Sequence, residues 1–204
     1  MQKNLDYINK LGLTLTQAQL DTLNGYVELV WQKKNDLNLT SVAGKQEIWT
    51  RHIIDGLNAT AIIKKEGKQN FTAADLGSGA GYIGIAIGVA LPECEVTLVE
   101  SLERRCAFMR WVILKLGIKN IKVVNIRAGE GAHDLYDFVT ERAMGKIEDI
   151  LGICMGFVKE GGKFLAYQTD ATAGTALGGT ASAYTLPEDD KTRHIVVFTK
   201  HGNN

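Results

Sequence analysis

ADLGSGAGYIG, residues 74–84, places four closely spaced glycines behind an apolar segment. The preceding segment FTAADL (71–76) predicts a buried strand, and the apolar residues after the loop predict a helix that Pro92 brings to an end. Glycine adopts backbone conformations closed to other residues and lets another group approach the main chain closely. A glycine-rich loop between a strand and a helix therefore indicates a backbone that lies against a ligand.

Two ligand-binding patterns fit this loop. Gly79, Gly81 and Gly84 have the G-x-G-x-x-G spacing of dinucleotide-binding folds. Asp75, Gly77 and Gly79 have the D-x-G-x-G spacing of S-adenosylmethionine-dependent methyltransferases. The glycines alone leave both patterns open, together with a turn that has a purely structural role.

Asp75 and the surrounding pattern favour the sulfonium cofactor. A carboxylate at the end of the strand would repel a pyrophosphate at the helix N-terminus, whereas it suits the cationic ammonium group of a methionine moiety. Glu100 ends the next predicted strand, about 20 residues further on, where an acid in this kind of fold accepts ribose hydroxyls. An NAD-dependent oxidoreductase that uses the same glycines is the alternative hypothesis, and it lacks an obvious set of catalytic residues.

Beyond the loop, strand and helix patterns alternate, which predicts an α/β fold with a parallel, doubly wound sheet. Further strands are predicted over residues 94–100, 121–126, 137–141 and 161–168. Residues 169–186 consist almost wholly of Thr, Ala, Gly and Ser and predict a long mobile loop. No helical pattern precedes RHIVVFTK (193–200), so we expect this last strand to be antiparallel to the fifth.

The N-terminal third of the chain has helical periodicity and no strand alternation. Thr16 and Gln19 form a capping-box pair before a long helical pattern, and residues 49–57 carry a further helical stripe. We therefore expect a helical extension (1–65) that packs on a methyltransferase domain (66–204), the two forming one globular unit.

Composition limits the classes of partner and the cellular compartments that fit this chain. The charges of the 23 basic and 23 acidic side chains cancel, whereas a protein that binds nucleic acid is more often basic overall. Local basic patches could still contact nucleic acid. No apolar run approaches the ~18 residues of a membrane span, and the polar N-terminus lacks a signal-peptide pattern. Three scattered cysteines without a C-x-x-C pair indicate a reducing compartment and no structural zinc. We expect a cytoplasmic protein that holds no metal.

Seven motifs occur along the chain in this order: NLTSV (38–42), RHIIDGL (51–57), ADLGSGAGYIGIAIG (74–88), LVESLERRCAFMR (98–110), NIRAGE (125–130), TERAM (140–144) and GGKFLA (161–166). In this combination the chain resembles the RsmG (GidB) family, bacterial enzymes that methylate guanine N7 of 16S rRNA in the small ribosomal subunit. The resemblance covers about residues 20–168, and RHIVVFTK is similar to the family's last strand. It implies a class I S-adenosylmethionine-dependent methyltransferase with 16S rRNA or the 30S subunit as its partner, and we expect a monomer.

The resemblance also implies a set of cofactor-binding residues. The loop would lie against the methionine and ribose, Tyr82 would line the same pocket, and Glu100 would accept the ribose hydroxyls. Backbone at the third strand's end would face the adenine. The expected cofactor-binding residues are Asp75, Gly77, Gly79, Gly81, Tyr82, Glu100, Ala128, Gly129 and Arg142.

The expected chemistry requires no general base, because guanine N7 carries an in-plane lone pair that attacks the methyl group without losing a proton. Alignment of the reacting atoms should supply most of the catalysis. Asp75 is expected to help as positive charge develops, and Arg142 to hold a phosphate or a base edge through two hydrogen bonds. For Arg142 the structural alternative is a salt bridge with Glu141 or Glu148.

Arg51 and His52 are the other expected substrate-binding residues. Together with Asp55 they would place a cation, an imidazole and an acid along one helix face. A pair of His52 and Asp55 that only stabilises the helix explains the spacing equally well.

Some positions depart from the family pattern. Ile83 replaces a usual proline, Gly56 a usual serine, Gly129 an expected acid and Gln168 a common lysine. These departures motivate a further hypothesis, a family member that binds cofactor or RNA with reduced turnover.

Overall fold

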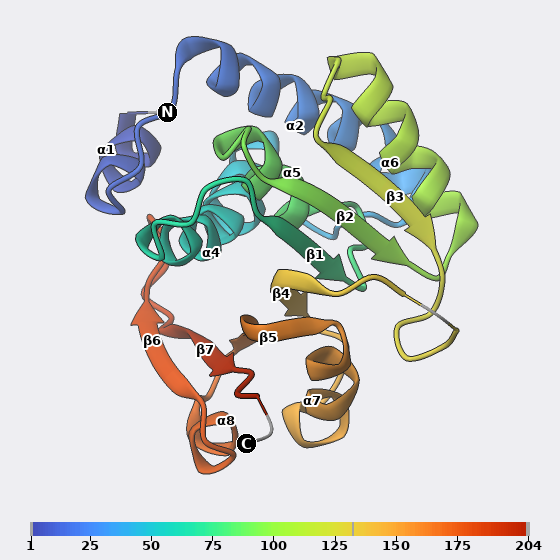
Figure 1. Ribbon diagram of the computed structural model, residues 1–204. Coiled ribbons are helices and arrows are strands. Elements are labelled where there is room, and N and C mark those ends of the chain that lie inside the picture. The colour runs from blue at the N-terminus through green and yellow to red at the C-terminus, as the bar shows by residue number, and fades with distance from the viewer. Residues whose placement is uncertain (1, 132, 203–204) are drawn as a thin grey trace.

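Seven strands form one sheet in the order β3-β2-β1-β4-β5-β7-β6 (Figure 1). The structure is a computed structural model that describes residues 2–131 and 133–202. The strands are β1 (Thr72–Leu76), β2 (Glu95–Glu100), β3 (Ile121–Asn125), β4 (Tyr136–Arg142), β5 (Val158–Gln168), β6 (Thr180–Tyr184) and β7 (Arg193–Thr199). Every strand that the sequence predicts is present, and β6 is additional.

Helices cover both faces of this sheet (Figure 1). Their bounds are α1 (Gln2–Lys10), α2 (Gln17–Leu37), α3 (Lys45–Ile48), η1 (Trp49–Ile53), α4 (Ile54–Lys65), α5 (Tyr82–Ala90), α6 (Glu103–Leu116), α7 (Ile147–Gly156) and α8 (Thr172–Ala176). The predicted capping box begins α2, because the Thr16 amide donates to Gln19 Oε1 over 2.8 Å and the Thr16 hydroxyl accepts from the Gln19 amide.

The strand directions show which edge of the sheet can bind a ligand. β1 is parallel to β2 and β4, β2 to β3 and β4 to β5, so the carboxyl ends of five strands share one edge. β7 is antiparallel to β5, with Phe164 opposite Phe198. The predicted doubly wound α/β fold with an antiparallel last strand is confirmed, and its glycine loop lies at the edge where such sheets bind ligands.

The prediction of a long mobile loop over residues 169–186 is wrong. This segment forms α8 and then β6, an edge strand that pairs antiparallel with β7 from Thr180↔Val197 to Tyr184↔Arg193. The first four β6 side chains are exposed and Tyr184 is half-buried, so the strand has no apolar alternation for the sequence to display. Main-chain pairing with β7 holds this strand, which has no row of buried side chains.

The N-terminal helices share an apolar core with one face of the sheet. Gly56 in α4 lies so close to α5 that an added Cβ would stand 2.7 Å from the Ala86 Cβ and 3.1 Å from the Tyr82 carbonyl oxygen. The serine usual at position 56 would not fit here without moving α5. The division between a helical extension and a methyltransferase domain near residue 65 stays a prediction.

The predicted helix over residues 49–57 contains a wider turn. α3, η1 and α4 follow one another directly, and η1 is a π-helical segment in which the Ile54 amide donates to the Trp49 carbonyl. Such segments are rare and are frequent at functional sites. This one carries Arg51 and His52.

A second apolar cluster packs α7 against the opposite face of the sheet.

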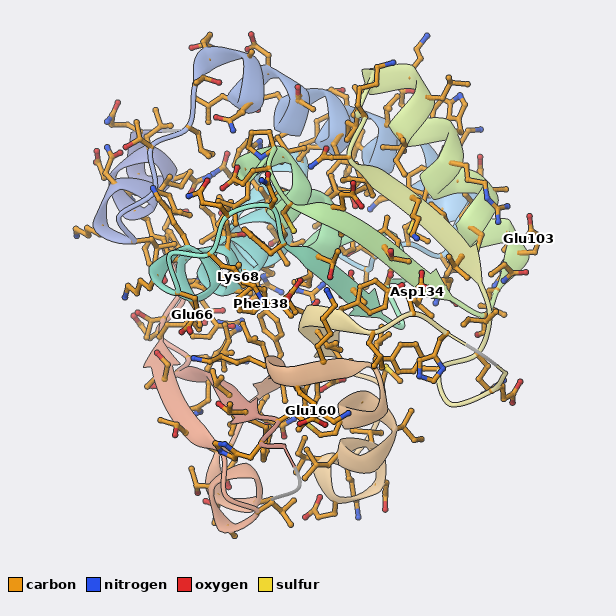
Figure 2. All side chains as sticks on the ribbon, viewed as in Figure 1. Glu66, Lys68, Glu103, Asp134, Phe138 and Glu160 are labelled. Atoms are coloured by element: carbon orange, nitrogen blue, oxygen red, sulfur yellow. The ribbon has the colours of Figure 1, made fainter. Side chains whose placement is uncertain are left out.

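Charged side chains just after α4 connect α4 to the sheet. Glu66 pairs with Lys163 over 2.6 Å, and Lys68 contacts Asp137. Figure 2 labels Glu66, Lys68 and Phe138 of β4 in this part of the molecule. No helix among the described residues has the length and apolar character needed to cross a membrane.

Candidate active site

The glycine loop is shaped by two glycines with different tasks. Gly77 has a φ of +64°, and an added Cβ would stand 2.7 Å from the Met144 Cγ, so both conformation and space exclude a side chain. At Gly84 an added Cβ would stand 2.2 Å from the Leu98 Cδ2. Gly77 therefore permits the left-handed turn of the loop against Met144, whereas Gly84 lets α5 pack closely on the sheet.

Asp75 is buried and engaged by the protein itself. Its Oδ1 accepts from the Thr140 hydroxyl over 3.0 Å, and its Oδ2 accepts from the Gly84 amide over 3.1 Å. Burial raises the pKa of this carboxyl to about 6, although both hydrogen bonds favour the charged form. The arrangement fastens the start of α5 to β1 and β4, and a catalytic role for Asp75 stays a prediction.

Glu100 braces the loop from the end of β2. Its Oε2 accepts from the Gly79 amide and its Oε1 from the Leu102 amide, each over 2.9 Å. The Arg105 guanidinium lies 3.7 Å from Oε2. The Ser101 hydroxyl also donates to Oε1 over 3.4 Å, so three of the about four acceptor sites of this carboxylate are used within the protein, and its contact with ribose hydroxyls stays a prediction.

Arg142 reaches from the end of β4 to the helices. Its Nη1 lies 2.7 Å from Asp55 Oδ2, and its Nη2 lies 3.3 Å from His52 Nδ1. Among the described residues its ion pair is with Asp55, so the alternative of a bridge to Glu141 or Glu148 is wrong. His52 and Asp55 turn toward the same arginine, which explains their spacing better than a pair that only stabilises the helix.

The hydrogen bonds of His52 determine its tautomer. Arg142 can only donate, so the His52 Nδ1 must accept, and the proton must lie on Nε2, which donates to the Thr40 hydroxyl over 2.9 Å. Burial and the Arg142 charge lower the pKa of this imidazole to about 3. His52 is therefore a neutral, fixed group that stacks on Tyr82.

Asp75, Arg142, His52 and the glycine loop line one pocket of about 380 Å³ at the carboxyl ends of the strands, and Glu100 is not among its lining residues. A volume of this order accommodates a small-molecule cofactor. The lining combines residues of the glycine loop with Arg142, His52 and Tyr82. Polar main chain, a ring and a cation thus meet at this pocket, where Asp75 adds a carboxylate and Asp55 pairs with the cation of Arg142.

The structure brings some of the predicted site residues together and leaves others outside. The predicted residues that line the pocket are Asp75, Gly77, Gly79, Tyr82, Arg142 and His52. Gly81 is instead the N-cap residue before α5, with a φ of 91°, and Arg51 is exposed, with its carbonyl 3.4 Å from Arg142 Nη1.

Ala128 and Gly129 are not among the residues that line this pocket. Ala128 packs against the cluster under α7, and Gly129 has a φ of +92° with Ile153 beneath it. An acid at position 129 would be strained in this conformation. Their contact with adenine stays a prediction, as do the other site assignments.

The sequence argument missed several pocket residues. Leu39, Thr40 and Ser41 form one side through the segment after α2, and Arg105 enters from α6. The motif NLTSV carried a signal for the first three, but nothing in its spacing says that they face a cofactor. Among the described residues no three His, Cys, Asp or Glu side chains are grouped as metal ligands, and a metal-free site stays a prediction.

Comparison with known proteins identifies relatives over most of the chain. Residues 19–195 match the family described as GidB, rRNA small subunit methyltransferase G. The chain is 30% identical to the ribosomal RNA small subunit methyltransferase G of Limosilactobacillus reuteri (strain DSM 20016), over 93% of this chain and 86% of the relative. It is 33% identical to the protein of the same name from Acetivibrio thermocellus, over 93% of this chain and 84% of the relative.

Solved structures share the fold at low identity. A methyltransferase from Pyrococcus furiosus has a TM-score of 0.56 at 16% identity and covers 87% of this chain and 97% of its own. A SAM-dependent methyltransferase from Aquifex aeolicus has a TM-score of 0.53 at 14% identity and covers 68% and 88%. These matches do not support the oxidoreductase alternative. The chain is an S-adenosylmethionine-dependent methyltransferase and belongs to the rRNA small subunit methyltransferase G family.

Proposed function

We propose that this protein transfers the methyl group of S-adenosylmethionine to N7 of a guanine in the 16S rRNA of the small ribosomal subunit. The observation that carries the proposal is the pocket in which Arg142, His52 and Tyr82 face the glycine loop. The two relatives are named for the ribosomal RNA of the small subunit. The choice of guanine N7 rests on the resemblance of the seven motifs.

The side chains at this pocket suit a reaction that needs orientation and no proton transfer. The bound cofactor supplies an electrophilic methyl group. Asp75 and Glu100 accept hydrogen bonds from the Gly84 and Gly79 amides and so fix the backbone of the glycine loop. A fixed loop can hold the cofactor and the guanine in line for transfer. No residue is required to accept a proton from N7, and the neutral His52 is consistent with that requirement.

Arg142 is the residue we assign to the substrate. Asp55 occupies Nη1, and Nη2 lies at the pocket beside His52, so part of the guanidinium remains free to hold a phosphate or base edge. The face-to-face rings of His52 and Tyr82 give the pocket a flat wall. A guanine drawn out of folded rRNA would find stacking and a cation at the same place.

The decisive experiment is methyl transfer from tritiated S-adenosylmethionine to 30S subunits that lack the modification, followed by mapping of the labelled base. We expect label on guanine N7 of 16S rRNA. Label on another base, or none beside a positive control enzyme, would refute the proposal. Absent transfer with intact binding of S-adenosylhomocysteine would instead identify a family member with reduced turnover.

We further propose that the protein acts as a monomer in the cytoplasm. A ribosomal substrate favours that compartment, and the buried thiols Cys94, Cys106 and Cys154 are unpaired among the described residues. Sedimentation with and without 30S subunits tests the monomer, and a stable dimer in the free protein would contradict it.

A further inference from the structure

The edge strand β6 reaches the active site through one hydroxyl. Tyr184 ends β6, and its Oη lies 2.5 Å from Asp55 Oδ1 in α4. The other four residues of β6 are exposed, whereas Tyr184 is half-buried. Burial and the Asp55 charge raise the pKa of Tyr184, so this hydroxyl stays protonated and donates.

Asp55 connects that hydroxyl to Arg142. The carboxylate is buried, with 5% of the side chain exposed, and its two oxygens have separate partners: Tyr184 on Oδ1 and Arg142 Nη1 on Oδ2, 2.7 Å away. The Asp55 carbonyl accepts from the Tyr167 hydroxyl over 2.9 Å. Two tyrosines from β5 and β6 thus fix the main chain and the carboxylate of this aspartate.

The division of the two oxygens decides how Arg142 is oriented. A guanidinium and a carboxylate tend to form two parallel hydrogen bonds when both oxygens are available. Here the pairing is single: Arg142 Nη1 contacts Oδ2, while Oδ1 accepts from the Tyr184 hydroxyl. Arg142 Nη2 is left to contact His52 Nδ1 at 3.3 Å, on the side of the pocket.

We propose that Tyr184 is a positioning residue for methyl transfer: its hydroxyl fixes the carboxylate of Asp55, which holds Arg142 through Nη1 and so keeps Arg142 Nη2 directed at His52 and the pocket. The inference rests on the proposed function, because it assigns Arg142 to the substrate. It gives a task to β6, the strand that the sequence did not predict. The ring acts through Asp55 and touches none of the reacting atoms.

The test compares Tyr184→Phe with Tyr7→Phe. Each variant removes one hydroxyl that donates to a side chain of α4, but the Tyr7 Oη bonds Asn58 Oδ1 at 3.1 Å and has no link to Arg142. The first readout is the guanidinium signal of Arg142 in ¹⁵N NMR of the free protein, assigned by its loss in Arg142→Lys. The second is the rate of methyl transfer at saturating 30S subunits.

We expect Tyr184→Phe to move the Arg142 signal and to lower kcat about tenfold, the size associated with one hydrogen bond to a charged group. Tyr7→Phe should do neither, while both variants lose similar thermal stability. In an Asp55→Asn background Tyr184→Phe should have no further effect on kcat, because the path runs through that carboxylate.

An unmoved Arg142 signal, or a kcat within twofold of the parent despite lower thermal stability, would overturn the inference and leave Tyr184 a structural residue. The NMR arm needs no substrate. If the parent protein fails to methylate 30S subunits, the proposed function fails by that result, and the Arg142 signal still decides whether Tyr184 orients the arginine.

Discussion

The imidazole of His52 lies flat on the ring of Tyr82, with centroids 4.1 Å apart and an interplanar angle of 19°. The contact joins the π-helical turn of η1 to the first residue of α5, directly beside the glycine loop. Arg142 approaches the same ring, with its Cζ 5.7 Å from the centroid. The pocket wall is thus a set of flat groups whose orientations depend on one another.

The first prediction concerns the protonation of His52. Its pKa of about 3 and its donor bond to Thr40 mean that the folded protein should hold the neutral Nε2–H tautomer between pH 5 and 8. Long-range ¹H–¹⁵N NMR of the ring should show that tautomer without titration over this range. In Arg142→Met the pKa should rise, because a repelling charge is gone; a midpoint above pH 5 in the parent protein would contradict the assignment.

The second prediction concerns Arg142 and Asp55. Arg142→Met should lower the free energy of unfolding by about 3–5 kcal/mol, because it leaves a buried carboxylate without its partner. Adding Asp55→Asn should restore most of that stability, while methyl transfer stays low in both variants. The measurements are urea unfolding and the transfer assay. A double variant with normal transfer would show that Arg142 serves stability alone.

A surface ion pair provides the control for that cycle. Arg110 and Glu103 are paired over 2.8 Å with 47% and 64% of their side chains exposed. Arg110→Met should therefore change the free energy of unfolding by at most about 1 kcal/mol. A loss as large as that of Arg142→Met would mean that the burial of Asp55 is not the cause.

The third prediction concerns the glycine loop. Gly77→Ala should weaken binding of S-adenosylhomocysteine at least about tenfold, because φ is +64° and the new Cβ would meet Met144 beside the pocket. Gly67→Ala is the matched control: its φ is +65°, and nothing lies within 4 Å of an added Cβ. Calorimetry should find equal affinity in Gly67→Ala and the parent. Equal losses in both variants would point to general backbone strain.

These contacts also show what the sequence could predict. The loop, Glu100 and Arg142 stand within or directly after predicted strands, and parallel strands bring their carboxyl ends together without any knowledge of packing. The Tyr184–Asp55 contact spans 129 positions, and Tyr184 ends a strand of Thr, Ala and Ser. The periodicity of neighbouring residues carries no information about a contact between residues so far apart in the sequence. The sequence also did not predict the π-helical turn, because the apolar spacing of residues 49–57 is that of an ordinary helix.

The fourth prediction concerns the packing of α4 on α5. Gly56→Ala should lower the free energy of unfolding by about 1–3 kcal/mol, because the added methyl would overlap Ala86 and the main chain of α5. Gly152→Ala, in α7 with nothing within 4 Å of an added Cβ, should raise it by about 0.4–1 kcal/mol. Denaturant unfolding of the two variants measures the difference. A gain in both would show that α4 and α5 can move apart freely.

The last prediction follows from Glu141, which is 1% exposed at the end of β4. Its Oε2 accepts from the Met144 amide over 3.1 Å, and its Oε1 has no partner among the described residues. Burial raises the pKa of this carboxyl from 4.5 to about 7. The unfolded chain ionises first as pH rises, so the stabilising effect of the protonated group is complete below about pH 4.5 and is lost as pH approaches 7.

A pKa difference of this size corresponds to about 3 kcal/mol of unfolding free energy. Glu141→Gln should remove that part of the pH dependence in denaturant unfolding between pH 5 and 8, whereas Glu148→Gln, on the exposed side of α7, should leave it unchanged. A second dependence of the same sign should persist in both variants at somewhat lower pH, because burial also raises the pKa of Asp75, from 3.8 to about 6. If Glu141→Gln keeps the full dependence of the parent protein, then the carboxylate is solvated in solution and its unpartnered oxygen has found a donor.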